Sequence, residues 1–137
     1  MKAKELYLAW VKAWNEDVSI LDQIVSPACL VQQARIDGES SHQQQGPEAL
    51  KKMITEGKYY FSDVEMTVDV GPIVETPYVS ARWTFTGSYK GGMDGATAEI
   101  GKKVQFSGMD IFLVKDGQLH EYWVSSDGID LLSQLGI

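Results

Sequence analysis

An aspartate in the middle of an apolar segment is the first residue of this sequence whose type and place suggest chemistry. Asp110 stands among Phe106, Ile111 and Phe112, in a segment that alternates like a strand. A buried carboxylate is costly unless it is paired, hydrogen-bonded or protonated, so Asp110 is a candidate catalytic acid or base. The alternative is a structural aspartate bonded to the backbone or to Arg82, because ion-pair networks also hold buried carboxyls.

A second aspartate, Asp127, follows Trp123 by four residues near the end of a predicted strand. We expect both side chains to point toward one cavity, with Asp127 as the first choice for a general acid/base. Tyr122 and His120 have the opposite parity to Trp123, so we expect them to face solvent or a subunit contact. The alternative role for Asp127 is the N-cap of a helix over residues 128–136.

Large aromatic side chains provide candidates for a binding wall. The predicted substrate-binding residues are Trp14, Gln32, Tyr60, Trp83 and Trp123. The aromatic rings suit a small apolar or aromatic metabolite, and Gln32 or its neighbour Gln33 can orient a carbonyl or hydroxyl by hydrogen bonds. The alternative is that these aromatics are ordinary core residues, which is their commoner role at helix and strand spacing.

The cysteine and histidine content argues against a metal centre. Cys29 is the single cysteine, it stands in an apolar stretch, and it allows no internal disulfide. His42 and His120 are the two histidines, and His42 falls in a polar loop where it is either solvated or within reach of a substrate. With no cluster of metal-binding side chains for zinc or iron, we expect no metal.

These candidates must be positioned by helices that come first and strands that come later. Apolar spacing predicts helices over residues 2–15 and 18–25, a third that begins at Gly46-Pro47-Glu48, and a last one ending at Gly136. Alternating segments predict strands over 29–36, 64–70, 78–89, 102–115 and 118–125. This order favours an α+β fold, in which the helices cover one face of a curved antiparallel sheet.

Length and charge limit the possible classes of protein. The 137 residues are enough for one core, so we expect a single domain over residues 1–137. The net charge of −7 repels phosphate groups, which argues against nucleic acid and anionic membranes as partners. No signal peptide and no apolar run of roughly 20 residues is present, so we expect a cytoplasmic protein.

The predicted strand over 103–114 suggests a subunit contact. Both of its faces become apolar toward the end of the strand, although the helices can cover only one of them. We therefore expect a homodimer in which a second subunit covers the other face.

The order of short motifs in the last third of the chain resembles a known family. Gly101-Lys102-Lys103-Val104 is followed by a second motif, Phe106 to Phe112, and a third, Asp116-Gly117-Gln118-Leu119; the series ends with Glu121-Tyr122-Trp123, Asp127 and Gln134-Leu135-Gly136. Upstream, Gly46-Pro47-Glu48, Phe61-Ser62-Asp63 and the segment from Arg82 to Gly87 also fit, more loosely. This pattern resembles the SnoaL-like polyketide cyclases, of the nuclear-transport-factor-2-like superfamily.

The resemblance implies a cone-shaped fold, usually dimeric, whose cavity opens between the helices and the concave face of a bent sheet. Family cyclases close the last ring of an aromatic polyketide by an intramolecular aldol condensation, without metal or cofactor. Such a reaction needs a group that removes a proton from carbon and a donor for the oxygen that becomes negative. The resemblance therefore implies a cyclase or isomerase acting on a carbonyl-rich, apolar metabolite.

Two positions differ from the family pattern. Many members have a histidine where this chain has Gln32 or Gln33, and an acid directly after the tryptophan, where this chain has Val124. Neither replacement can transfer a proton near neutral pH. The alternative function is therefore a non-catalytic protein that binds a small ligand in the same cavity. A limonene-type epoxide hydrolase is disfavoured, because its arginine two residues before an inward acid is replaced here by Gly108.

Overall fold

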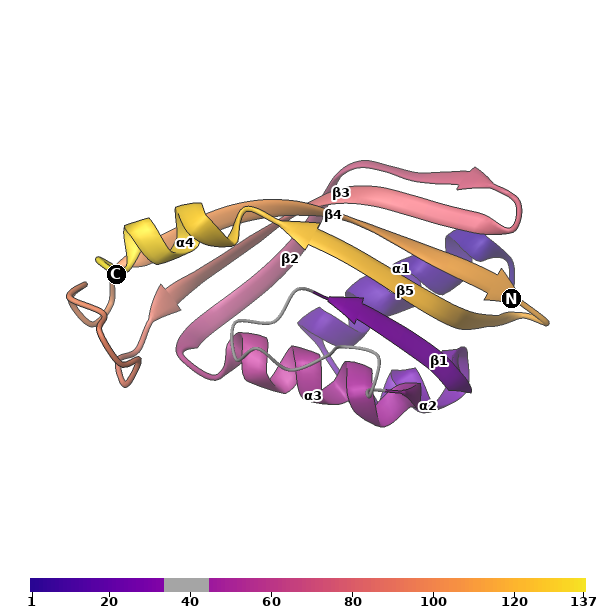
Figure 1. Cartoon of the computed structure of the whole chain (residues 1–137), viewed down its shortest axis with the longest axis horizontal. Coiled ribbons are helices and arrows are strands. Elements are labelled where there is room, and N and C mark those ends of the chain that lie inside the picture. The colour runs from indigo at the N-terminus through magenta and orange to yellow at the C-terminus, as the bar shows by residue number, and fades with distance from the viewer. Residues whose placement is uncertain (34–44) are drawn as a thin grey trace.

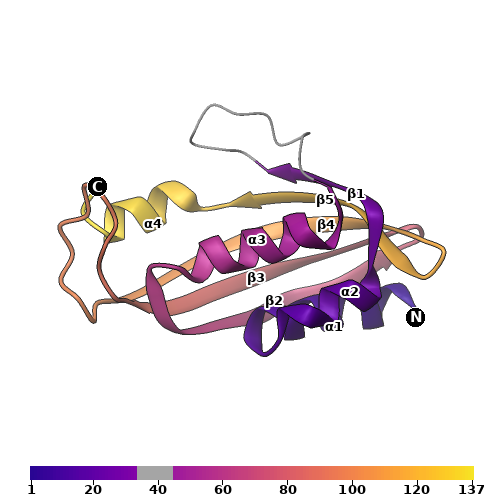
Figure 2. The ribbon, with the colours of Figure 1, turned by 90° about the horizontal axis from the view of Figure 1, so that it is seen from below.

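The computed structural model describes residues 1–33 and 45–137. His42, with the loop role predicted for it, lies outside these residues. Five long strands form one bent sheet, with α1, α2 and α3 gathered on one face of it and α4 at one end (Figures 1 and 2). The predicted α+β class is confirmed. No helix within the described ranges is long and apolar enough to cross a membrane.

The first half of the chain supplies most of the helices. These are α1 (Ala3–Asn15), the 3-10 helix η1 (Val18–Ile20), α2 (Leu21–Ile24) and α3 (Gly46–Lys58). The apolar stripe predicted for the first helix is buried: Leu6, Tyr7, Trp10 and Trp14 all face the sheet. Asp17 caps the second helical segment as expected, by accepting a hydrogen bond from the backbone N–H of Ser19.

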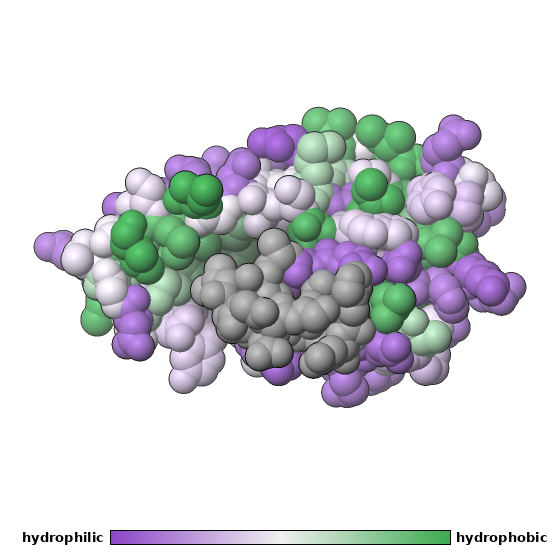
Figure 3. All heavy atoms as spheres, in the orientation of Figure 1, coloured by the Kyte–Doolittle hydropathy of each residue, from purple (hydrophilic) through white to green (hydrophobic). Residues whose placement is uncertain are grey.

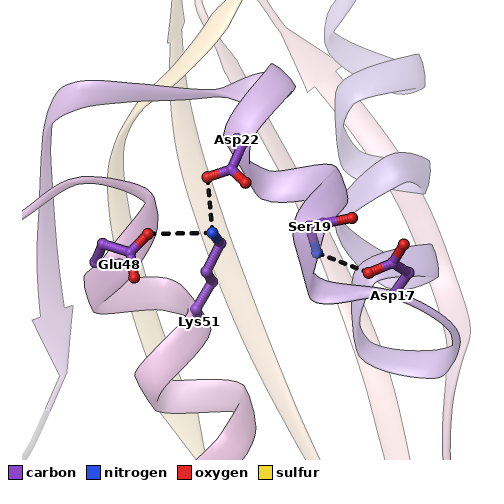
Figure 4. A network of polar contacts seen from close by, with 5 residues as sticks. All are labelled: Asp17, Ser19, Asp22, Glu48 and Lys51. Atoms are coloured by element: carbon purple, nitrogen blue, oxygen red, sulfur yellow. Dashed lines mark hydrogen bonds and ion pairs between the residues drawn. The ribbon is translucent and has the colours of Figure 1, made fainter.

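A polar network joins α2 to α3 at the edge of the helical layer (Figure 4). Lys51 of α3 reaches Asp22 of α2 at 2.7 Å and Glu48 of its own helix at 3.1 Å. The side chain of Lys51 is 21% exposed, whereas both carboxylates lie nearer solvent. The network therefore fixes how α2 and α3 meet, at some distance from the interior of the fold.

The sheet contains β1 (Val25–Gln33), β2 (Phe61–Glu75), β3 (Tyr78–Tyr89), β4 (Lys103–Lys115) and β5 (Gln118–Ser126), in the order β1-β5-β4-β3-β2. All neighbouring pairs are antiparallel except β1 and β5, which run parallel, so the sheet is mixed where an antiparallel one was expected. β1 also begins four residues before the predicted strand. Pro27 is tolerated there because β1 is an edge strand.

A β-bulge in β5 reverses the predicted orientation of its side chains. Leu113 pairs with Glu121 while the next residue, Val114, pairs with Leu119, so His120 is an extra residue on β5. Beyond the bulge, the alternate side chains of β5 that would have faced the helices face outward, and the others face inward. As a result Tyr122 is 2% exposed and faces the interior, whereas Trp123 faces outward against the ring of Tyr78. The prediction that Tyr122 faces solvent or a subunit contact is therefore wrong.

Candidate active site

Asp110 is the centre of a buried cluster of hydrogen bonds between α1, β4 and β5. Its side chain is 2% exposed and accepts three hydrogen bonds: from the Tyr7 hydroxyl at 2.7 Å, the Tyr122 hydroxyl at 2.9 Å and the Trp10 indole N–H at 3.3 Å. The bonds connect residues up to 103 positions apart in the chain. Of the structural alternatives, the bond between Asp110 and Arg82 is not observed, because Arg82 pairs with Met109 on the opposite parity of β4.

The surroundings of Asp110 set its proton affinity. Burial raises the pKa of Asp110 to about 6, although the hydrogen bonds from Tyr7, Tyr122 and Trp10 act in the opposite direction. Burial, reinforced by the charge of Asp110, also raises the pKa of Tyr7 and of Tyr122 far above the usual value for tyrosine. Both hydroxyls therefore remain protonated donors, while Asp110 can gain or lose its proton close to neutral pH.

This carboxyl lines a partly open cavity of about 130 Å³ between the helices and the sheet. The wall is mostly apolar, and the residues around it are Tyr7, Trp10, Val11, Trp14, Gln33, Met53, Gly57, Met66, Trp83, Phe106, Asp110, Tyr122, Val124 and Ser126. Catalytic carboxyl groups whose pKa is shifted toward neutrality are typically found in apolar surroundings of this kind.

The structure brings three of the predicted site residues together at this cavity: Asp110, Trp14 and Trp83. The others lie elsewhere. Asp127 is exposed at the start of α4 (Gly128–Gln134), where its backbone accepts a bond from Leu131 N–H while its side chain makes no capping bond. Trp123 lies on the outward face, and Tyr60 packs edge-on against Tyr59. Gln32 pairs with Trp123 in the β1–β5 register, and its neighbour Gln33 borders the cavity.

Sequence reasoning did not assign a site role to Tyr7, Trp10 or Tyr122. A signal for the first two existed: Tyr7, Trp10 and Trp14 are spaced three and four residues apart, which places them on one face of a helix. Tyr122 was assigned to the wrong face because the bulge at His120 has no signature in the sequence.

The described ranges contain no group of three or more histidine, cysteine, aspartate or glutamate side chains that could hold a metal ion. Cys29 is fully buried, and burial, together with the charge of Glu121, raises the pKa of its thiol to about 12. The thiol is therefore an inert part of the core.

Comparison with known proteins identifies the family of this chain. The family model described as SnoaL-like polyketide cyclase matches residues 4–135. The chain belongs to this family. No match was found among curated proteins.

Solved structures similar to this SnoaL-like chain cover nearly its whole length. TsrD from Streptomyces laurentii is 28% identical, with a TM-score of 0.78 over 96% of this chain and 92% of the other. IdmH from Streptomyces antibioticus is 20% identical, with a TM-score of 0.84 over 100% of both chains. A SnoaL-like polyketide cyclase from Agrobacterium tumefaciens is 18% identical, with a TM-score of 0.75 over 99% and 100%. The last two similarities concern the fold.

Asp110 lies next to Val124, one of the two positions that differ from the family pattern. Val124, which stands where many members have an acid, is paired directly with Asp110 across the β4–β5 ladder. Both residues line the cavity. The chain thus carries a carboxyl on the adjacent strand, beside the place where the family pattern has one.

Proposed function

We propose that this protein is an enzyme of the cyclase or isomerase type that uses Asp110 as a general acid/base on a carbonyl-containing apolar metabolite. The observation that supports this most is the buried carboxyl of Asp110, held by Tyr7 and Tyr122 in an apolar cavity, with a pKa raised to about 6. Catalytic bases work best when their pKa lies near the operating pH. At pH 7 such a group is mostly ionised and can therefore act as a base.

The reaction class follows from what a single carboxylate can do. The carboxylate of Asp110 removes a proton from the carbon beside a carbonyl, and the electron pair of the C–H bond moves to form an enolate. In a cyclase the enolate carbon then attacks a second carbonyl carbon of the same molecule, and the proton on Asp110 returns to the new alkoxide. In an isomerase the same proton returns to a different carbon. Both routes balance without an oxidant or a reductant.

Asp110 rather than Asp127 has this role in the proposal. Asp127 is exposed and does not border the cavity, whereas Asp110 is buried within it. A non-catalytic ligand-binding protein stays the second candidate, because the same apolar wall would hold a ligand whether or not a proton moves.

Exchange of hydrogen for deuterium separates the two candidates without knowledge of the natural substrate. Cyclohexanone is compact and carries exchangeable protons beside its carbonyl, and their loss in D₂O is measured by ¹H NMR. We expect the protein to accelerate this exchange above the buffer rate. Exchange at the buffer rate, with cyclohexanone bound, would favour the ligand-binding candidate.

The exchange should also depend on pH in a defined direction. The base form of Asp110 is needed, and its pKa is about 6, so the exchange rate per protein should be constant above about pH 7 and fall below pH 6. The fall should approach tenfold per pH unit. A rate that is flat from pH 4.5 to 8 would contradict the role of Asp110.

The proposal includes a homodimer formed through the outward face of the sheet. Exposed apolar side chains gather on this face and include Val70, Ile73, Tyr78, Met109 and Ile111, each between 41% and 58% exposed. Hydrophobic side chains are visible over the β2–β3 end of the sheet (Figure 3). Ile73, Tyr78, Ile111 and Trp123 border a groove of about 580 Å³ there. An apolar patch of this kind on a sheet is typical of a contact with a second subunit.

Light scattering after size-exclusion chromatography tests the dimer. We expect twice the mass of one chain for the wild type and the mass of a single chain for Ile111→Lys, because a buried unpaired charge opposes association. Ile129→Lys is the matched control, since Ile129 is 86% exposed on α4 and outside this face. A monomeric wild type would contradict the proposed dimer and leave the reaction chemistry unaffected.

A further inference from the structure

Two tryptophans that line the cavity have buried indole N–H groups without a hydrogen-bond partner among the described residues. Trp14 of α1 and Trp83 of β3 both line it and are 8% and 6% exposed, and neither indole nitrogen has a partner among the residues that the structure describes. Trp10, by contrast, donates its indole N–H to Asp110. Buried donors in folded proteins are rarely left unpaired, so these two need an acceptor from outside the described side chains.

The two rings are held firmly, so they cannot turn easily to find another acceptor. Trp14 packs edge-on against Trp10 at 6.1 Å and against Phe85 at 6.3 Å between ring centroids, and Trp83 packs edge-on against Phe106 at 5.7 Å. Hydrogen-bond donors that are already held in place stabilise a negative charge that develops on oxygen during a reaction.

Two glycines make room for these rings. A Cβ atom on Gly57 would lie 3.0 Å from Cη2 of Trp14, and a Cβ atom on Gly108 would overlap Cζ2 of Trp83. Gly57 stands inside α3, where glycine weakens a helix, so its presence there is consistent with a need for the close approach of Trp14. Both indole positions thus depend on the absence of a side chain on a neighbouring element.

Asp110 does not satisfy these donors: the three hydrogen bonds that its oxygens accept come from Tyr7, Trp10 and Tyr122. Apolar groups such as Val11, Met53 and Phe106 make up much of the remaining wall. The volume of about 130 Å³ is below the usual range for drug-sized ligands and near that of an apolar cavity known to hold one benzene ring.

We propose that the indole N–H groups of Trp14 and Trp83 bind the carbonyl oxygen of the ligand, and that the part of the ligand in the cavity is about the size of a single ring. The inference rests on the proposed function for the chemistry that the bound oxygen undergoes. The enolate formed when Asp110 removes a proton would carry its negative charge at that oxygen. The indoles are therefore binding groups for the substrate and for the intermediate.

A matched pair of probes tests the proposal by NMR. Cyclohexanone carries the carbonyl oxygen, and methylenecyclohexane has the same shape with CH₂ in its place. In ¹⁵N-labelled protein, the indole cross-peaks of Trp14 and Trp83 are assigned from Trp14→Phe and Trp83→Phe. We expect cyclohexanone to move both peaks downfield and methylenecyclohexane not to do so. The Trp123 peak, on the outward face, serves as the internal control.

Affinities give a second readout. Each Trp→Phe change should weaken cyclohexanone binding by about two- to tenfold, the effect of one hydrogen bond, and leave methylenecyclohexane binding within about twofold. Equal downfield shifts with both probes, or equal losses of affinity for both, would overturn the proposal. Absence of any shift with saturating cyclohexanone would overturn it as well, and would indicate that water satisfies the donors.

Repeating the NMR titration in Asp110→Asn separates the binding of the carbonyl oxygen from catalysis. Binding of the carbonyl oxygen does not require a base, so the cyclohexanone shifts should persist in this variant. If they persist while the wild type shows no exchange, the proposed reaction is wrong and the indole site stands. If exchange occurs without the shifts, the indole site is wrong and the reaction stands.

Discussion

Replacing Asp110 by asparagine is expected to abolish the exchange of cyclohexanone protons while it makes the folded protein more stable at neutral pH. Asparagine is close in shape to aspartate: its oxygen can take the place of Oδ2, which accepts from Tyr122 and Trp10, and its amide can donate to the Tyr7 hydroxyl, but it cannot take up a proton. Loss of a general base typically lowers a rate by about 10²- to 10⁴-fold. We therefore expect the exchange rate of Asp110→Asn to approach that of buffer.

The gain in stability follows from the direction of the pKa shift. The folded protein holds the pKa of Asp110 at about 6, above the value of about 3.9 for an unfolded aspartate. Between these values the folded state binds more protons, so the free energy of unfolding of the wild type falls as the pH rises from about 4 to 6. The full penalty above pH 7 is about 2–3 kcal/mol, since one pKa unit corresponds to about 1.4 kcal/mol. Asparagine carries no charge and avoids this penalty.

Urea unfolding of both proteins between pH 4 and 8 measures the effect. The two free energies of unfolding should be close at pH 4 and diverge through pH 6, with Asp110→Asn the more stable at pH 7.5. Asp130→Asn is the matched control, because Asp130 is exposed on α4, and its curve should follow that of the wild type. An Asp110→Asn variant that is less stable than wild type at pH 7.5 would mean that the carboxylate is a structural ion and not a strained functional group.

Asp127→Asn should be measured alongside, because the sequence favoured Asp127 as the acid/base. Its exposed position predicts retention of most of the exchange activity. Loss of exchange in Asp127→Asn together with retention in Asp110→Asn would reassign the base to the start of α4.

The general fold was accessible from the sequence because its signals are local. The spacing of Leu6, Trp10 and Trp14 predicts α1, and the alternation of β3 is read directly from its residues, since every second side chain is buried. These patterns depend on residues close together in the chain. The pairing of β1 with β5 joins residues about ninety positions apart, and no local pattern reports it.

The site was only partly accessible for the same reason. Asp110 stood out because a charge in an apolar strand is unusual, whereas its partner Tyr7 lies 103 residues away and reaches it only through the fold. Trp123 was predicted to line the cavity because it stands four residues before Asp127, and β5, which carries an extra residue at His120, turns it outward. A β-bulge depends on how two strands meet, so the parity of a strand is predicted less well than its existence.

Gly108→Ala is expected to destabilise the protein and to disturb the cavity, because the new methyl group has no space. Gly108 on β4 is paired with Trp83 on β3 and with Ser126 on β5. Its Cβ atom would overlap Cζ2 of Trp83 and lie 2.8 Å from both Cη2 of that ring and the backbone oxygen of Ser125. Because the Ser125 oxygen belongs to a central strand pair, the ring of Trp83 has to move. Overpacking of this kind typically costs about 1–3 kcal/mol.

Gly128→Ala is the matched control for this change, because nothing lies within 4 Å of its Cβ position and it begins a helix, where alanine is favoured. Thermal unfolding should show a lower midpoint for Gly108→Ala and an unchanged or higher one for Gly128→Ala. Cyclohexanone affinity should fall for Gly108→Ala alone.

The double variant Gly108→Ala/Trp83→Phe decides whether the indole ring causes the effect. Phenylalanine lacks the outer indole atoms that the methyl group meets, so the second change should recover part of the stability lost in the first, and a double-mutant cycle should show favourable coupling between the two sites. Additive losses would mean that the Ser125 backbone, and not Trp83, occupies the space beside Gly108. In that case the glycine shapes the β4–β5 ladder and has no part in placing the Trp83 indole at the cavity.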